Sequence, residues 1–517
     1  MRQFTTALLG SAALCAIAMG LPAHAAGHAK LQATVAGTYA TNIHGEDAAE
    51  IAAHHAGTQR LFVINGNDKT VDVIDFADPA NMVLIKQIAL SAYGKAANSV
   101  AVAGDTVLVA VESADKQANG VLVFMDTDGN VQGTVELGVL PDMIAVSPDG
   151  KYAVVANEGE PNSDYTNDPE GSVSIVTLAD RTVRTVSFAS LTREQFGDTA
   201  HFPSPAGTSV AQDLEPEYVA ISKDSTTAFV TAQENNAMLV VDLEQGAVTN
   251  AFGLGLKDWS TLTFDASDKD GALRLKSWPV VSLYQPDAIA AFEANGTTYI
   301  VTANEGDARE YEGTPGYVEE TRVAKLKLDP AQFPNAAALQ AKDQLGRLKT
   351  TLAKGDDDGD GMHERIVAFG GRSFSVYTGD GTQVFDSGDE FGRILAAQFP
   401  AEFNSQGAEN SFDARSDDKG VEPEGVVIGM VGDTRYAFIG LERMGGVMVY
   451  DLTDPAAPTF VSYLKSNDPK GDPKKGTAGD VGPEGLVFID AANSPTGKPM
   501  LVVSHEVSGT TTAWELQ

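Results

Sequence analysis

The sequence feature that most constrains the fold is a repeated pair of carboxylates. Five times, Pro followed by an acid opens an apolar stretch, and a Glu closes the next strand. The openings are Pro141-Asp142, Pro216-Glu217, Pro286-Asp287, Pro423-Glu424 and Pro483-Glu484, and the closings are Glu158, Glu234, Glu305, Glu442 and Glu506. Two weaker copies come first, Glu50 to Asn65 and Asn98 to Glu112. A repeat with carboxylates at equivalent points places them in rings.

Each copy continues with a third strand, a turn and often a fourth strand. Asp-Pro, Asp-Gly and Gly-Asp mark the turns, and Val, Ile, Phe and Tyr dominate the strands. Four short antiparallel strands repeated radially are the blades of a β-propeller. The sequence therefore predicts an all-β, seven-bladed propeller over residues 26–517, with six or eight blades left open if a copy is misread.

The two ends of the chain predict how the ring closes. The last copy stops at TTAWELQ, which is only its third strand, and the segment 31–41 has strand character. We expect this N-terminal strand to complete the last blade, which removes two open sheet edges. The longest insertion, about residues 306–371, lies in the fifth blade and contains a predicted helix over 330–348.

The first 25 residues have the features of a signal peptide. Arg2 supplies the charge, residues 8–21 the apolar stretch, and Ala23-His24-Ala25 the cleavage site. No other segment is long and apolar enough to span a membrane. Cys15, the only cysteine, lies in the signal, so the mature chain has no disulfide. We expect an exported protein, periplasmic or secreted, and a monomer.

The charge balance excludes one class of partner. The chain has 36 basic and 71 acidic residues, a net charge of −35. Nucleic acids require a basic surface, so we expect no nucleic-acid binding. Most of the acids are explained by a solvated acidic surface. Where several acids lie close together, divalent cations would offset their negative charge.

The repeated acids are candidate metal ligands. Because like charges disfavour ionisation, so many carboxylates converge only with cations or with raised pKa values. Hard oxygen ligands favour calcium, or another divalent metal. The predicted ligands are Glu217, Asp287, Glu424, Glu442 and Glu484. The alternative is that these acids cap loops by accepting backbone N–H bonds.

A second candidate metal site is the loop from Gly355 to Gly361. Asp356, Asp358 and Asp360, followed by Gly361, match the first half of a calcium loop. The twelfth position is Val367, so no bidentate Glu closes the loop, although Glu364 lies nearby. The sequence predicts calcium here in a structural role, and the alternative is a plain acidic loop.

Three arginines are candidate catalytic residues together with Glu305. Arg309 follows the closing Glu305, Arg372 lies at a glycine turn, and Arg443 follows Glu442. An arginine beside metal-bound carboxylates is suited to clamp a phosphate. The alternative is that each arginine merely pairs with a ring carboxylate. His201 and His505 are weaker candidates for metal or acid–base roles.

Three long motifs resemble the choice-of-anchor family I proteins, which are exported bacterial propellers related to animal mesenchyme-specific cell-surface glycoproteins. The motifs are ANEGDAREYEGTPGYVEETRV from Ala303, GDDDGDGMHERIVAFGGRSFSVY from Gly355 and VEPEGVVIG from Val421. Some family members are labelled alkaline phosphatases. A more distant similarity is to propeller phosphatases and phytases, whose channels bind calcium through carboxylates.

Two functions follow as hypotheses. The first is a metal-dependent phosphoesterase, alkaline phosphatase-like, which acts on a small phosphorylated substrate at the carboxylate-lined channel. The second is a non-catalytic, calcium-stabilised propeller that binds a surface ligand or serves in adhesion. Fold analogy alone does not choose between them.

Overall fold

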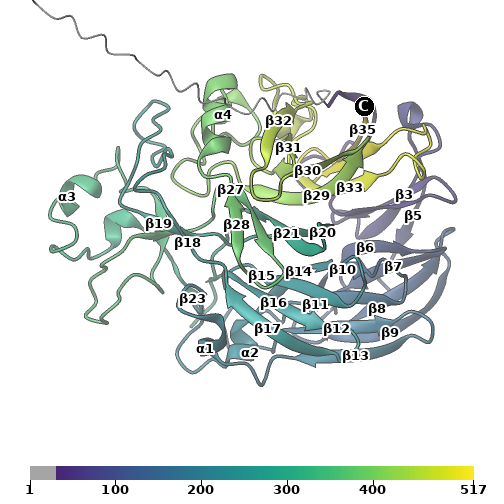
Figure 1. Ribbon diagram of the computed structural model, residues 1–517, viewed down its shortest axis with the longest axis horizontal. Helices are drawn as coiled ribbons and strands as arrows, with labels where there is room; N and C mark the ends of the chain where they lie inside the picture. The colour runs from purple at the N-terminus through teal and green to yellow at the C-terminus, as the bar shows by residue number, and fades with distance from the viewer. Residues whose placement is uncertain (1–30) are drawn as a thin grey trace, which may run out of the picture. The chain divides into compact units, whose positions relative to one another are not determined.

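The computed structural model describes residues 31–517, which form one compact unit that is mostly β (Figure 1). The predicted signal peptide and Cys15 lie outside the described residues. Within that range no helix is both long and apolar enough to cross a bilayer.

Seven four-stranded antiparallel sheets make up most of the fold. The first three are β2 Ala52–His55, β3 Arg60–Asn65, β4 Thr70–Asp75, β5 Val83–Ala89; β6 Ala97–Ala103, β7 Thr106–Val111, β8 Asn119–Asp126, β9 Val131–Val139; and β10 Pro141–Val146, β11 Tyr152–Asn157, β12 Ser172–Thr177, β13 Thr182–Ser187. The next two are β14 Pro216–Ile221, β15 Thr227–Ala232, β16 Ala237–Asp242, β17 Ala247–Gly253; and β20 Ile289–Ala294, β21 Thr297–Asn304, β27 Ser373–Thr378, β28 Gln383–Asp386. The last two are β29 Pro423–Val431, β30 Thr434–Leu441, β31 Val447–Asp451, β32 Thr459–Leu464; and β33 Pro483–Ile489, β34 Met500–His505, β35 Thr510–Leu516, β1 Ala33–Ala40.

The first strands of the seven sheets contact one another in a cycle. Each of β2, β6, β10, β14, β20, β29 and β33 packs against the next, and β33 packs against β2. The repeated sheets around one set of first strands are the arrangement expected of a β-propeller. Apolar side chains fill the space between neighbouring sheets; Val154, Val173 and Leu239, for example, share one buried cluster.

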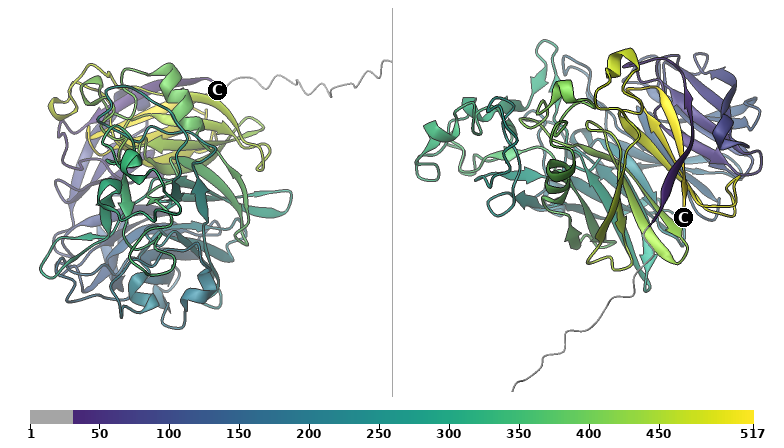
Figure 2. Two further views of the ribbon diagram at one scale, coloured as in Figure 1. Left: turned by 90° about the vertical axis from the view of Figure 1, so that its left-hand side faces the viewer. Right: turned by 90° about the horizontal axis from the view of Figure 1, so that it is seen from above.

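The predicted pairing of the N-terminal segment with the last strand is confirmed. β1 pairs antiparallel with β35, from Ala33 opposite Leu516 to Ala40 opposite Thr510. Figure 2 (right) shows β1 in purple beside the yellow C-terminal strand. The last sheet thus contains residues from both ends of the described chain.

The longest insertion joins the second and third strands of the fifth sheet, β21 and β27. Its strands and helices, with those of the preceding connection, are β18 Leu256–Asp258, β19 Val281–Leu283, β22 Glu310–Tyr311, β23 Tyr317–Val318, β24 Glu320–Arg322, η2 Val323–Lys325, α3 Ala336–Leu339, β25 Lys349–Thr351 and β26 Val367–Ala368. The two segments share a second apolar core that includes Trp259, Trp278 and Phe333. The other short elements are η1 Pro79–Asn81, α1 Arg193–Phe196, α2 Val210–Asp213, α4 Glu390–Gln398, η3 Glu409–Ser411 and η4 Pro473–Lys475.

The helix predicted over 330–348 is wrong in length. Only α3 is helical, and the chain turns after it, where Leu345 N–H donates to the carbonyl of Leu339. The turn brings Leu339, Leu345 and Leu348 into the second core, which a straight helix would not do. Tertiary burial overrides the helix propensity of this alanine-rich segment.

A buried carboxylate fastens the last sheet. Asp480 accepts hydrogen bonds from the hydroxyls of Thr510 and Thr512, both at 2.8 Å, and from Ser466 at 2.5 Å. Burial alone would raise the pKa of Asp480, but His505 and the three hydroxyl donors hold it below its ordinary value. Asp480 thus ties β35 to the segment that leads into β33.

Replacing Asp480 is therefore expected to destabilise the fold. Asp480→Asn exchanges one acceptor oxygen for an amide that faces hydroxyl donors, and we expect a loss of about 2 kcal/mol in the free energy of unfolding. Urea denaturation measures it, with the exposed turn variant Asp433→Asn as control. Equal stabilities of the two variants would contradict this role.

Candidate metal centre

The structure explains why the repeat carries proline before the acid. In four sheets the first strand begins at the proline, and the pairing register shifts directly after it. Such a bulge re-aims the side chain that it contains. The preceding residue adopts positive φ in three copies, at Leu140 (51°), Gln285 (47°) and Glu422 (51°). The local backbone is therefore shaped to position the acid that follows.

These acids form what we call the inner ring: Glu50, Asp142, Glu217, Asp287, Glu424 and Glu484. Four of its members, Glu50, Asp142, Asp287 and Glu484, line a cavity of about 200 Å³ together with Asn98 of the second sheet and Tyr218. Each ring member is the second residue of the first strand of its sheet or lies two residues before that strand. The cycle of first strands thus places one end of six of the seven sheets around a single acidic cavity.

The closing acids form a second set at the same mouth, which we call the outer ring: Glu112, Glu158, Glu234, Glu305, Glu442 and Glu506. In each antiparallel pair the end of the second strand faces the start of the first, as where Pro141 lies opposite Asn157 and Pro483 opposite His505. The acid one or two residues after the second strand therefore comes beside the inner ring. The sequence alone left open which mouth these acids reach.

Burial and mutual repulsion raise the pKa values of the inner ring. Desolvation is the largest cause throughout, followed by neighbouring carboxylates. The pKa of Asp142 rises to about 7, with Glu160 as the main neighbour, and that of Glu50 to about 9, with Glu484. Those of Glu217 and Glu424 rise well above their ordinary value.

The inner ring has no basic partner. Among residues 31–517, none of its six acids lies within 4.0 Å of a Lys, Arg or His nitrogen. One carboxylate oxygen of Glu217 and one of Glu424 are buried without any hydrogen-bond partner. An unpaired buried oxygen is costly unless a cation, a proton or water satisfies it. The donor set therefore fits a hard divalent ion.

A tighter acidic cluster lies at the rim but is already neutralised. Oxygens of Glu305, Glu422 and Glu442 lie within 4.8 Å of one another. Lys419 binds Glu305 at 2.8 Å, and Arg415 and Arg443 bind Glu422 at 2.7 and 3.1 Å. Three basic side chains thus balance three carboxylates. The geometry alone favours an ion here, but the charge balance makes the inner ring the better candidate.

Sequence reasoning missed Glu422. The available signal was the acid that precedes the proline, since Glu422-Pro423-Glu424 repeats the order of Glu215-Pro216-Glu217. Both preceding acids are buried and bind arginines, Glu215 with Arg309 and Glu422 with Arg415. In both copies the acid before the proline forms an ion pair and the acid after it belongs to the inner ring.

Protein oxygens bind all three predicted catalytic arginines, but only two of the arginines are buried. Arg309 is buried, pairs with Glu215 and donates to the carbonyl of Asp213. Arg372 is also buried, has positive φ and donates to backbone carbonyls that include those of Asp265 and Ser416. Arg443, by contrast, lies at the mouth, paired with Glu442 and Glu422. Only Arg443 is brought together with ring acids and partly exposed.

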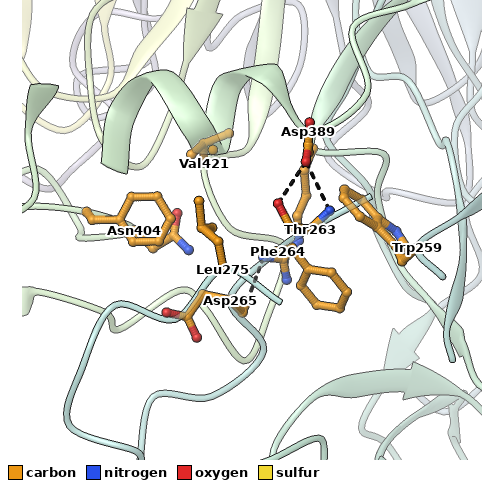
Figure 3. A pocket seen from close by; sticks show the side chains of 11 residues that line it. Trp259, Thr263, Phe264, Asp265, Leu275, Asp389, Asn404 and Val421 are labelled. Carbon is orange, nitrogen blue, oxygen red and sulfur yellow. Dashed lines mark hydrogen bonds between the residues drawn. The ribbon is translucent and has the colours of Figure 1, made fainter. Parts of the chain in front are cut away.

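The pocket beside Arg372 is too small for a substrate (Figure 3). Its lining includes Trp259, Asp265 and Asn404, and Asp389 accepts hydrogen bonds from the amide and hydroxyl of Thr263. Its volume of about 20 Å³ has room for a single water. This region belongs to the packing of the connection between β17 and β20 against α4 and the residues that flank it.

The predicted calcium loop brings its three acids together at the surface. Oxygens of Asp356, Asp358 and Asp360 lie within 4.8 Å of one another. These carboxylates also accept hydrogen bonds from backbone N–H groups of their own loop; for example, the Gly359 N–H donates to Asp356 at 2.8 Å. The neighbouring Glu364 accepts from the amide of Asp357. Loop capping and ion binding are compatible here, because each carboxylate keeps free lone pairs.

The two histidines are structural in this arrangement. His201 is buried and lies 2.8 Å from Glu319, which also accepts from the amide of Arg309. His505 is buried beside Asp480, and burial lowers its pKa. Neither lines the acidic cavity.

The raised pKa values predict a pH dependence for the metal-free protein. The folded state keeps protons on Asp142 and Glu506 up to about pH 7, whereas the unfolded chain loses them near pH 4. Each extra proton bound by the folded state lowers the stability by about 1.4 kcal/mol for every pH unit gained. In EGTA, thermal melts should therefore show falling stability from pH 5 to pH 8. A rise over that range would contradict the ring electrostatics.

Two known proteins are similar in sequence to part of this chain. A mesenchyme-specific cell surface glycoprotein of Strongylocentrotus purpuratus is 26% identical over 300 residues, which is 52% of this chain and 38% of that protein. Gigasin-3a of Magallana gigas is 29% identical over 199 residues, 35% of this chain and 67% of that protein. The chain therefore spans well under half the length of the first of these relatives.

Two solved structures are similar over nearly the whole chain. Hydrazine synthase of Kuenenia stuttgartiensis aligns with a TM-score of 0.46 at 14% identity, over 91% of this chain and 96% of that one. A streptogramin B lyase aligns with a TM-score of 0.43 at 8% identity, over 94% and 98%. The family model for the choice-of-anchor I domain matches residues 50–455, which contain the first five four-stranded sheets and strands β29, β30 and β31 of the sixth. With this match over most of its length, the chain belongs to the choice-of-anchor I family.

Proposed function

We propose that the seven sheets are the blades of one closed propeller and that its acidic mouth binds divalent cations, calcium foremost. The cyclic contacts of the first strands and the β1–β35 pairing support the closed ring. The signal-like first 25 residues support export to the periplasm or the exterior.

One observation carries the cation site. The inner ring gathers six carboxylates without a basic partner, and two of them carry buried oxygens without a hydrogen bond. Glu217, Asp287, Glu424 and Glu484 would hold the ion. Among the described residues, no three inner-ring acids bring oxygens within 4.8 Å of one another. Calcium tolerates such a site best, because it accepts flexible geometry and water ligands.

The function that this arrangement supports best is calcium-dependent binding of an anionic surface ligand. An ion held at the mouth would place positive charge on an otherwise acidic protein, whose net charge is −35. The loop of Asp356, Asp358 and Asp360 would bind a second, structural ion. Isothermal titration of the metal-free protein with calcium tests the site: we expect at least two binding events, and no binding at millimolar calcium would sink the proposal.

Phosphoester hydrolysis is the second candidate, favoured by the position of Arg443. This side chain lies at the mouth, beside ring carboxylates, and is 32% exposed. A bound cation would supply charge neutralisation and a lowered pKa for an attacking water. Arg443 would orient a phosphate through its guanidinium. Arg309 and Arg372 have no part in this candidate, because both are buried, whereas the Arg443 side chain is partly exposed.

The hydrolase candidate predicts turnover of p-nitrophenyl phosphate that requires added calcium and stops in EGTA. Arg443→Ala should lower kcat/KM about 100-fold, whereas Arg435→Ala, which removes a half-buried arginine at the start of β30, should not. Absence of turnover with calcium, magnesium and manganese would leave the binding function alone.

A further inference from the structure

The acidic cavity adjoins a second cavity of about 300 Å³, which we call the shaft. From the level of the inner ring the shaft follows β2 to His54, β6 to Val102 and β10 to Val146. The acidic cavity and the shaft therefore form one elongated space among the first strands. Four residues line both: Ile51, Ser99, Met143 and Tyr218.

The two parts of this space differ in charge. The acidic cavity is lined by the carboxylates of Glu50, Asp142, Asp287 and Glu484, and its lining includes no basic side chain. The lining of the shaft contains no carboxylate, lysine or arginine, and most of its side chains are those of alanine, valine, leucine and isoleucine. Burial lowers the pKa of His54, so this member of the shaft wall is neutral at pH 7.5. A ligand that matches both parts carries positive charge at one end only.

The junction of the two cavities offers contacts that suit an organic ammonium group. Ser99 is 2% exposed, and its hydroxyl oxygen accepts a hydrogen bond from the Ile144 amide at 3.3 Å. A hydroxyl oxygen has two lone pairs, so one remains for a further donor. Tyr218 adds an aromatic ring to the wall beside the carboxylates. Aromatic rings attract organic cations, whereas a bound metal ion would use neither this ring nor the shaft.

From these contacts we propose that the channel binds a primary organic ammonium ion with an apolar chain. The ammonium group lies among the four carboxylates, next to Ser99 and Tyr218. The chain extends along the shaft between β2, β6 and β10. The extended segment from Glu50 to His54 rises about 13 Å, which is long enough to accommodate a hexyl chain.

This inference goes beyond the calcium proposal and is tested apart from it. Asp287 and Glu484 belong to both sites, so calcium and the amine are expected to exclude each other. The shaft matters only for the amine, and titrations in EGTA examine the amine alone. Calcium binding without amine binding would refute this inference only, and amine binding without calcium binding would refute the calcium site only.

The test is calorimetric titration of the purified mature protein in EGTA at pH 7.5 with four probes. We expect hexylamine to bind at least about 10-fold more tightly than hexan-1-ol, which lacks the charge. Full burial of a methylene group is worth about 4-fold in affinity. The inner edges of the first strands also present backbone groups to the shaft, so we expect about 2-fold or more for each methylene between butylamine and hexylamine. Hexane-1,6-diamine should bind more weakly than hexylamine, because its second ammonium enters the uncharged shaft.

Three results with the unmodified protein would overturn the proposal. They are no binding of hexylamine at millimolar concentration, equal binding of hexan-1-ol, and equal binding of butylamine. Tighter binding of the diamine would also contradict it, since the shaft would then hold a second charge.

Two variants locate the site. Glu50→Gln combined with Asp142→Asn should weaken hexylamine at least about 10-fold, and neither acid is among the four assigned to the ion. Ala101→Leu adds volume to the shaft wall and should abolish the preference for hexylamine over butylamine. Glu293→Gln, an exposed acid on β20 that lines neither cavity, is the matched control. Circular dichroism and the melting temperature verify folding, and unchanged affinity in the folded double variant would refute the assignment.

Discussion

Replacing Glu217 and Glu424 together by glutamine is expected to raise the stability of the metal-free protein and to remove most of its stabilisation by calcium. Both pKa values are raised by burial and then by neighbouring acids, so ionised forms destabilise the fold at pH 8. Glutamine removes that repulsion. It also removes two anionic ligands, each with a buried oxygen that lacks a partner.

The stabilisation of the folded state by calcium follows from the ratio of the calcium concentration to its Kd. A ligand at 1,000 times its Kd stabilises the folded state by about 4 kcal/mol, and the double variant should lose at least about 3 kcal/mol of this. Melts in EGTA and in millimolar calcium measure both quantities. Glu293→Gln, an exposed acid on β20, serves as control. A double variant that is less stable in EGTA yet keeps the full calcium shift would contradict the inner-ring site.

Arg309→Met is expected to destabilise the protein by about 3–5 kcal/mol. The Arg309 side chain is fully buried and pairs with Glu215, which is also buried. Its removal leaves the Glu215 carboxylate buried without a positive partner. Removing one member of a buried ion pair is strongly destabilising for this reason. A second replacement, Glu215→Leu, should restore most of the loss, because it removes the stranded charge.

Urea denaturation measures this series, with Arg393→Met as the control. Arg393 forms an exposed i,i+4 pair with Asp389, which is worth about 0.5 kcal/mol or less. A stable Arg309→Met that only loses activity would restore the catalytic role predicted from the sequence. Failure of the double variant to recover would point instead to lost packing of the Arg309 side chain.

Much of the fold was predictable because the repeat encodes it locally. Proline at or just before the start of a first strand and an acid after the second strand recur in five of the seven sheets, and Val, Ile, Phe and Tyr mark the strands between them. The closing strand was predictable because the last copy lacks a fourth strand and residues 31–41 supply one. The helix over 330–348 was not, since burial of Leu345 and Leu348 decides the path of that segment.

The site was predictable in its residue types but not in its charge balance. Sequence spacing identified Glu217, Asp287, Glu424 and Glu484, and the structure brings this end of all the sheets to one mouth. Which acids are neutralised depends on residues far away in sequence: Lys419 reaches Glu305, and Arg415 reaches Glu422. From its neighbours in the sequence, Arg372 was interpreted as a phosphate ligand. In the structure its guanidinium donates hydrogen bonds to the backbone carbonyls of Asp265, Ser416 and Asp418.

The most direct test of the central claim is an anomalous difference map from crystals of the metal-free protein soaked in manganese chloride, which reports a divalent ion by position. The account predicts a peak at the channel mouth, within coordination distance of at least two of Glu217, Asp287, Glu424 and Glu484. A peak confined to the Asp356–Asp360 loop, or to the neutralised cluster of Glu305, Glu422 and Glu442, would contradict it.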